Sequence, residues 1–216
     1  METSFVLPAS WPYVGPKYWS VSPFGLRILI LGESHYRDRP LSREFTSDVV
    51  EAAMDGDTSP SLRFFARTVG AFLGGLQDLE SRKAFMETVA FYNFVQEPAG
   101  TGPRMRPSAE MWSRATPALI EVLDRLGPEF VLVLGKELWR NLPLRFGLGP
   151  AIKVAENDTL ESRVYFSDSE LRTLLFPIAH PSSVGWSYER WCPYVKAALK
   201  QAAISTNRKP VDLIRE

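Results

Sequence analysis

Cysteine and histidine are scarce in this chain, and their scarcity limits its chemistry. Among the 216 residues only Cys192 carries a thiol, which excludes an intrachain disulfide and any cluster bound by several cysteines of one chain. The two histidines are His35 and His180, so any chemistry that needs an imidazole must use one of them. The lack of disulfides predicts a reducing, cytoplasmic location.

Net charge and long apolar runs are also missing. Lys plus Arg number 25 and Asp plus Glu number 25, so the overall charge does not indicate a nucleic-acid partner. Such a partner must be bound by a local basic patch. No stretch reaches the roughly 18 consecutive apolar residues of a membrane helix, and the N-terminus lacks the basic start of a signal peptide. We therefore expect no contact with a membrane.

Length and composition predict one compact domain. A domain usually has about 100 to 200 residues, and the 45% hydrophobic and 23% charged residues of this chain are ordinary globular usage. We place residues 1–216 in a single domain. An aromatic, proline-rich arm at 1–24 is expected to pack on it, and a tail at 204–216 is expected to be loosely held.

Apolar runs alternate with segments of helical periodicity along the chain. The runs lie at 26–32, 88–95, 130–135 and 174–179, and the helical segments at 41–54, 61–73, 108–126, 136–146 and 187–203. This alternation predicts a three-layer α/β/α sandwich with a central four-stranded, mainly parallel sheet. Pro177, in the last run, predicts that this strand lies at an edge of the sheet.

Polar residues follow the predicted strands. Ligands of open parallel sheets bind outside the carboxyl ends of the strands, so these residues are the candidates for a site. They are Gly32, Glu33, Ser34, His35 and Tyr36 after the first run, Asn93 in the second, and His180 and Ser182 after the fourth. Both histidines therefore fall on the same rim of the predicted sheet.

These residues resemble the motifs of the uracil-DNA glycosylase superfamily. Its members have a Gly-led motif after the first strand, a base-reading Asn in a middle strand, and a His-Pro-Ser motif before a loop that enters the duplex. The matching residues here are Gly32-Glu33-Ser34-His35-Tyr36, Asn93 and His180-Pro181-Ser182-Ser183. The resemblance spans about residues 26–195.

The layout of the middle of the chain is most similar to the branch of that superfamily that carries an iron–sulfur cluster. That branch needs four Cys ligands, whereas this chain has Cys192 alone. We therefore expect no cluster and no other cofactor.

The resemblance implies a monofunctional DNA glycosylase that flips a base out of DNA and hydrolyses its N-glycosidic bond, leaving an abasic site. His180 would donate to the base oxygen as negative charge develops there. Asn93 would read the Watson–Crick edge of the base. Glu33 is the carboxylate inside the first motif and is the candidate for orienting water, with Asp38 second.

Other roles follow from the same comparison. The substrate-binding candidates are Gly32, Ser34, His35, Tyr36 and Ser182, and the DNA-binding candidates are Ser183, Val184, Trp186, Arg104, Arg106 and Lys136. Ser34 stands where the best-known uracil enzymes carry an Asp that positions water, and His35 where they carry Pro. The expected partner is double- or single-stranded DNA, bound by a monomer.

Two other functions stay open at this point. One is a non-catalytic nucleic-acid binding module, motivated by Ser34 in place of the Asp. The other is a serine esterase, because Gly32-Glu33-Ser34 is similar to the Gly-Asp-Ser opening of small esterases, with His180 as the base, although Pro177 stands where that family has an Asp. The glycosylase substrate is either a deaminated base, for repair, or a modified cytosine of phage DNA, for defence.

Overall fold

The computed structural model describes residues 8–21, 24–35, 40–56, 60–100, 105–167 and 172–206. The helices in these ranges are α1 (Phe45–Met54), α2 (Pro60–Leu73), α3 (Leu79–Met86), α4 (Ala109–Leu126), α5 (Lys136–Arg140) and α6 (Tyr188–Ser205). The strands are β1 (Tyr13–Val14), β2 (Ile28–Ser34), β3 (Ala90–Val95), β4 (Phe130–Leu134), β5 (Gly147–Leu148), β6 (Ile152–Ala155), β7 (Asp158–Leu160), β8 (Arg163–Phe166) and β9 (Arg172–Ile178).

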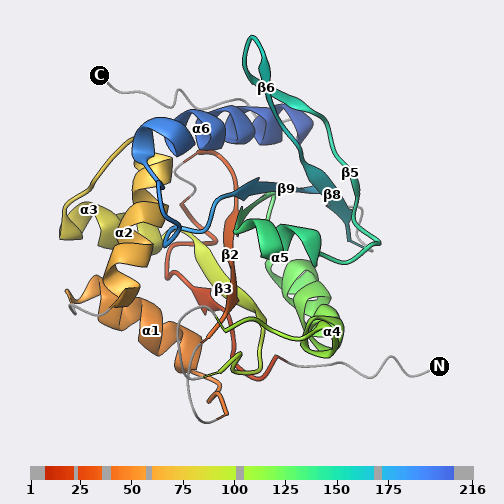
Figure 1. Cartoon of the computed structure of the whole chain (residues 1–216). Coiled ribbons are helices and arrows are strands. Elements are labelled where there is room, and N and C mark those ends of the chain that lie inside the picture. The colour runs from red at the N-terminus through yellow and green to blue at the C-terminus, as the bar shows by residue number, and fades with distance from the viewer. Residues whose placement is uncertain are drawn as a thin grey trace.

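The main sheet of the described chain has the strand order β1-β3-β2-β4-β9-β8-β5 (Figure 1). Its centre, β3-β2-β4-β9, is parallel and consists of the strands that the apolar runs predicted. The prediction of a four-stranded sheet is wrong, because antiparallel β1 is added to β3 and antiparallel β8 and β5 are added beyond β9, giving seven strands. The two-residue strands β1 and β5 are too short to show an alternating pattern in the sequence.

The prediction that the last apolar run lies at a sheet edge is also wrong. Strand β9 pairs with β4 on one side and with β8 on the other. Its pairing with β8 covers residues 172–175, so Pro177 lies beyond the end of β8. Proline lacks an N–H, and at this position the missing donor leaves no gap in the ladder with β8.

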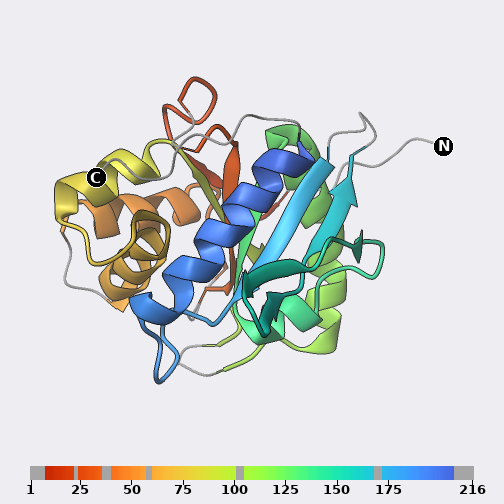
Figure 2. The ribbon, with the colours of Figure 1, turned by 90° about the horizontal axis from the view of Figure 1, so that it is seen from above.

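Helices cover both faces of the sheet. Ile28 and Ile30 belong to the core beneath α1, α2, α3 and α6, whereas Leu29 and Leu31 belong to the core beneath α4 and α5. Figure 1 shows β2 and β3 between these two groups, and Figure 2 shows α6 beside β9. Full burial on both faces explains why the central strands are continuous apolar runs rather than alternating ones.

Local capping explains where the longest helices begin. Ser108 accepts a hydrogen bond from the N–H of Met111, and Ser187 accepts one from the N–H of Arg190, so both serines are N-caps. The helix predicted over 136–146 is only the short α5. Helix α3 and the β6–β7 hairpin were not predicted. In the ranges described above, none of the helices is long and apolar enough to cross a membrane.

The described part of the N-terminal arm is fixed by a buried polar network. Ser10 is fully buried, and its N–H donates to Oε1 of Gln96 over 2.7 Å. Its Oγ accepts from the N–H of Thr46 over 3.0 Å and lies 2.8 Å from Oγ1 of Thr46. The arm thereby joins the start of α1 to the residue that follows β3.

We expect Ser10→Ala to lower the free energy of unfolding by about 1–3 kcal/mol, because it leaves the buried N–H of Thr46 without its acceptor. Urea denaturation followed by circular dichroism measures the effect. The matched control is Ser113→Ala, at an exposed position of α4. A change below about 0.5 kcal/mol at Ser10, as for ordinary surface substitutions, would contradict the role of this network.

Candidate active site at the carboxyl ends of the strands

His180 follows β9 and is half-buried at the rim of the sheet. The backbone N–H of Ser182 donates to Nδ1 of His180 over 3.2 Å, and Oγ of Ser182 lies 2.7 Å from the same nitrogen. A backbone N–H can only donate, so Nδ1 is an acceptor and the neutral ring carries its proton on Nε2. The chain thus presents an Nε2–H donor at this rim.

The environment of His180 keeps it neutral. Burial, with a smaller contribution from the charge of Arg106, lowers the pKa of His180 from 6.5 to about 4. Its ring lies 5.4 Å from the ring of Phe64 in α2, and the Phe64 ring in turn lies 6.0 Å from that of Phe91 in β3. At neutral pH the imidazole is therefore a hydrogen-bond donor without charge, in aromatic surroundings.

Asn93 lies directly across from Gly32 in the parallel pairing of β3 with β2. The Asn93 side chain is buried and turns over Gly32, where an added Cβ would lie only 2.0 Å from Oδ1 of Asn93. Such a contact does not occur between real atoms, so only glycine leaves room for the amide here. The Phe91 ring closes the same space, with its Cζ 3.2 Å from that Cβ position.

His35 positions Asn93. Its Nε2 lies 2.9 Å from Nδ2 of Asn93 and 3.4 Å from Oγ1 of Thr46, and its ring meets that of Phe45 edge-on. The imidazole is buried, so it faces Asn93 and α1 instead of an open cavity. The two histidines lie at the same end of the sheet, as predicted, but Nε2 of His35 is engaged by Asn93 and Thr46, whereas the contacts of the His180 ring with Ser182 are made through Nδ1.

Glu33 lies on the other face of the sheet from Gly32 and Asn93. It follows Leu29 and Leu31 in the alternation of β2 and turns toward the side of α4 and α5, whereas Gly32 and Asn93 face α2. Both of its oxygens accept from Nη1 of Arg106, at 2.9 and 2.7 Å. Glu33 is 6% exposed and Arg106 is 58% exposed, so the carboxylate lies beneath the guanidinium. Burial raises the pKa of Glu33 although the Arg106 hydrogen bonds lower it.

The Ser34 hydroxyl is not activated. Its Oγ is buried and has no hydrogen-bond partner among the residues that the structure describes. A serine nucleophile needs a base within hydrogen-bonding distance. The geometry therefore gives no support to an esterase that uses Ser34 with His180.

The loop after His180 is held against α2. Arg67 donates from Nη1 to the carbonyl of Pro181 over 2.6 Å, and its guanidinium lies 5.4 Å from the centre of the Trp186 ring. Trp186 is 7% exposed and therefore does not project from the surface, whereas Val184 is fully exposed. Of the two side chains, only Val184 projects from the surface.

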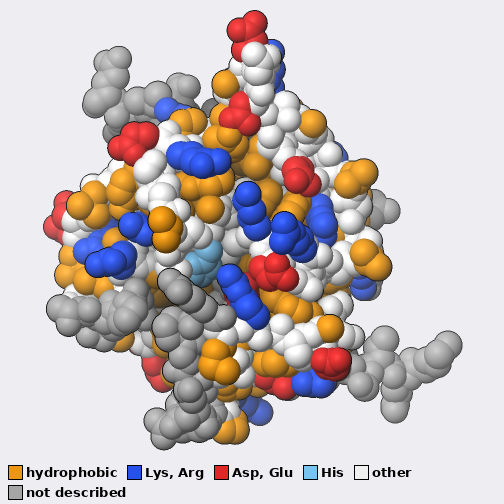
Figure 3. All heavy atoms as spheres, in the orientation of Figure 1, with side chains coloured by type: hydrophobic (Ala, Val, Ile, Leu, Met, Phe, Trp, Pro, Cys, Tyr) orange, Lys and Arg blue, Asp and Glu red, His pale blue; other side chains and the backbone are white. Residues whose placement is uncertain are grey.

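Basic residues lie on the same face. Arg106 and Lys136 are exposed, and Lys136 is the first residue of α5, directly beyond β4. Figure 3 shows a histidine on this face with Lys and Arg side chains on more than one side of it. Tyr36, Asp38 and Arg104, which the sequence analysis also selected, lie outside the described residues.

Sequence reasoning missed Phe64 and Arg67. No sequence signal singled out Phe64, because adjacent residues of a helix can share one apolar stripe, and Phe64 packs on the same core as Phe65. Phe65 is buried and Phe64 is half-buried beside His180. Arg67 lies one turn further along α2, and no pattern in the sequence connects it with Pro181, which is 114 residues away.

Comparison with known proteins does not supply a family. No protein-family model matches the chain, and no curated protein is significantly similar to it in sequence. The resemblance to the uracil-DNA glycosylase superfamily thus rests on the sequence motifs alone. Among the described residues, no group of three His, Cys, Asp or Glu side chains is arranged to hold a metal ion.

We expect Gly32→Ala to destabilise the fold by about 1–3 kcal/mol, as overpacking does, because its Cβ meets the Asn93 amide. The double variant Gly32→Ala/Asn93→Ala removes the amide and should recover part of the loss. The stability that the double variant does not recover should reflect the contact of the new Cβ with the Phe91 ring. Urea unfolding of the two single variants and the double variant gives the coupling energy. Additive effects would contradict the close contact.

Proposed function

We propose that the protein is a monofunctional DNA glycosylase, which flips one base out of DNA and hydrolyses its N-glycosidic bond. The observation that carries the proposal is the neutral His180, whose Nε2–H points away from Ser182 at the ligand-binding end of a parallel sheet. Phe64 beside it offers an aromatic face for a flipped base. The motifs described above support the same reaction.

The roles of the groups follow from the charges that develop. As the glycosidic bond breaks, its electron pair goes to the base, and a water molecule adds to the electron-poor sugar carbon. Nε2–H of His180 would stabilise the negative charge on a base oxygen by donating a hydrogen bond. Because its pKa is about 4, the ring is almost entirely unprotonated near pH 7. It therefore donates this hydrogen bond as a neutral group and does not transfer a proton to the base.

Asn93 would orient the base. One of its N–H groups is directed to His35, which leaves the second N–H and Oδ1 as a donor–acceptor pair. Such a pair matches the edge of a pyrimidine. The bond to His35 and the contact with Gly32 hold the amide in one orientation, and a held amide loses little freedom when the base binds.

Glu33 would orient the water only after Arg106 moves. A DNA phosphate competes for an exposed guanidinium, and Arg106 is exposed while Glu33 is not. Transfer of Arg106 to a phosphate would leave the carboxylate without this partner, and burial would then raise its pKa without the opposing effect of Arg106. DNA binding and the release of Glu33 would then be coupled.

We expect His180→Ala to slow base release by about 10²- to 10³-fold, as loss of one such donor does, with DNA affinity little changed. Duplex and single-stranded DNA containing uracil, hypoxanthine or a hydroxymethylated or glucosylated cytosine is incubated with excess protein, and abasic sites are cleaved with alkali. Asn93→Ala should also lose base release. The matched control, Asn157→Ala in the exposed β6–β7 turn, should keep base release.

The outcomes of this experiment separate the alternatives. Release of a deaminated base assigns the protein to repair, and release of a modified cytosine assigns it to defence. DNA binding without release from any substrate contradicts the glycosylase and favours the non-catalytic module. Labelling of Ser34 by a fluorophosphonate, with neither binding nor release, favours the esterase.

The pH dependence of base release should show no titration of His180 between pH 7.5 and 5. The pKa of this ring is about 4 in the folded protein, whereas an ordinary histidine titrates near 6.5. Below pH 6.5 the unfolded chain binds a proton at this position before the folded chain does, so stability falls as the pH drops toward 4. Single-turnover rates and urea unfolding of wild type and His180→Asn test both statements; a fall in rate centred near pH 6.5 would contradict them.

A further inference from the structure

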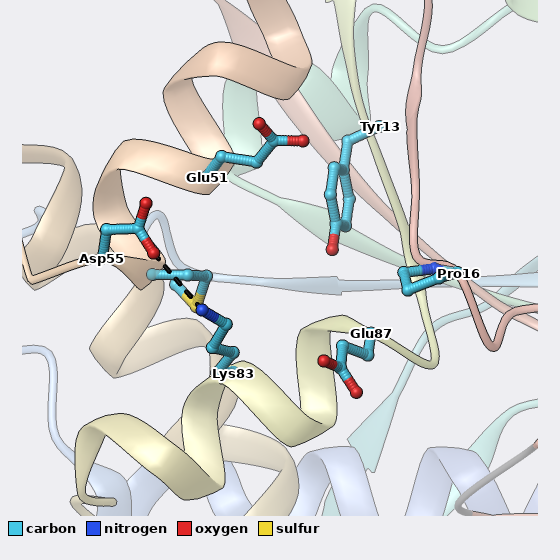
Figure 4. Close-up of a pocket in the computed structure, with 7 residues that line it drawn as sticks. Tyr13, Pro16, Glu51, Asp55, Lys83 and Glu87 are labelled. Carbon is cyan, nitrogen blue, oxygen red and sulfur yellow. Dashed lines mark hydrogen bonds and ion pairs between the residues drawn. The ribbon is translucent and has the colours of Figure 1, made fainter.

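A pocket at the opposite end of the sheet is unrelated to the candidate active site. Strand β1 runs antiparallel to β3 and pairs with its first residues, through Tyr13 with Phe91 and Val14 with Ala90. The pocket therefore lies at the amino end of β3, whereas Asn93 is near the carboxyl end. Its lining residues come from the arm, α1 and α3 (Figure 4): Tyr13, Pro16, Glu51, Met54, Asp55, Lys83 and Glu87.

Tyr13 directs an unsatisfied hydroxyl into this pocket. The residue is 8% exposed, and its hydroxyl forms no hydrogen bond with any residue in the described ranges. Figure 4 shows the hydroxyl pointing into the space between Glu51 and Glu87. Burial, followed by the charges of these two carboxylates, raises the pKa of Tyr13 to about 12. The phenol is thus neutral at physiological pH, and its oxygen can accept a hydrogen bond.

The carboxylates of the lining outnumber its one ammonium group. Lys83 pairs with Asp55 over 3.3 Å, and Glu87 pairs with Lys17, which stands outside the pocket. Glu51 forms no ion pair with any described residue. The lining therefore keeps negative charge next to an unused phenol oxygen, an arrangement that favours a cation.

We propose that this pocket binds an alkylammonium group. Acceptors approach from three sides, from Glu51, the Tyr13 hydroxyl and Glu87, which suits the three N–H donors of an ammonium ion better than the planar fork of a guanidinium. Met54 and Pro16 supply apolar surface for the alkyl chain. The ligand is either a free aliphatic amine or the side chain of a lysine in another protein.

The proposal does not depend on the glycosylase. The residues that line the pocket are separate from His180, Asn93 and the loops around them, so substitutions there should leave base release unchanged. Failure of one proposal therefore leaves the other standing.

Titration with n-butylammonium chloride at low ionic strength tests the site, followed by two-dimensional amide NMR. We expect saturable shifts confined to residues in β1, α1 and α3. Tyr13→Phe keeps the ring but removes the acceptor and should weaken binding about tenfold. Glu51→Gln should weaken it by up to about fivefold, and added salt should reduce binding further. Glu156→Gln, an exposed carboxylate in the β6–β7 turn, is the matched control and should bind as wild type does.

Further probes identify the ligand and show which results would overturn the proposal. n-Butanol has a similar apolar body without the charge and should not bind. Tighter binding of N-acetyl-lysine amide than of n-butylammonium indicates a protein lysine, and tighter binding of 1,4-diaminobutane indicates a free amine. Equal binding of n-butylammonium to wild type and a folded Tyr13→Phe variant, or shifts that do not saturate, would overturn the proposal. Circular dichroism and the unfolding midpoint show whether each variant is folded.

Discussion

The contact of the Asn93 amide with Gly32 is the constraint on which the rest of the candidate site depends. Parallel pairing of β2 and β3 places the two residues opposite each other, and the missing side chain of Gly32 leaves the space into which the amide turns. The amide then reaches His35, and His35 contacts Thr46 at the start of α1. A change of register by one residue would turn Asn93 to the other face of the sheet and separate these groups.

The other half of the site is positioned from α2. Arg67 fixes the loop at Pro181, and Phe64 stands between the rings of His180 and Phe91. One helix therefore aligns a loop near the C-terminal end of the chain with strands near its beginning. Because the interior is closely packed, a shift of α2 would be passed to His180 and to the aromatic side of the Asn93 pocket together.

The two ends of the sheet carry opposite electrostatic character. At the carboxyl ends, exposed Arg106 and Lys136 lie near a buried carboxylate and a neutral imidazole. At the amino end of β3, the Tyr13 hydroxyl faces Glu87 and Glu51, and Glu51 has no ion pair among the described residues. A chain with 25 basic and 25 acidic residues can therefore present one surface suited to phosphates and another suited to cations.

The sequence by itself determined the parallel centre of the sheet, both long capped helices and the rim on which both histidines lie. Each of these depends on local pattern: a strand buried on both faces is a continuous apolar run, and Ser108 and Ser187 stand just before helical stripes. Tertiary structure decided the rest. The short strands β1 and β5 form only because a neighbouring strand offers its edge, and the turn of Glu33 away from Asn93 follows from the pleat. The separate roles of His35 and His180 arise from contacts with residues that are distant in the sequence, Asn93 and Phe64, which no local pattern encodes.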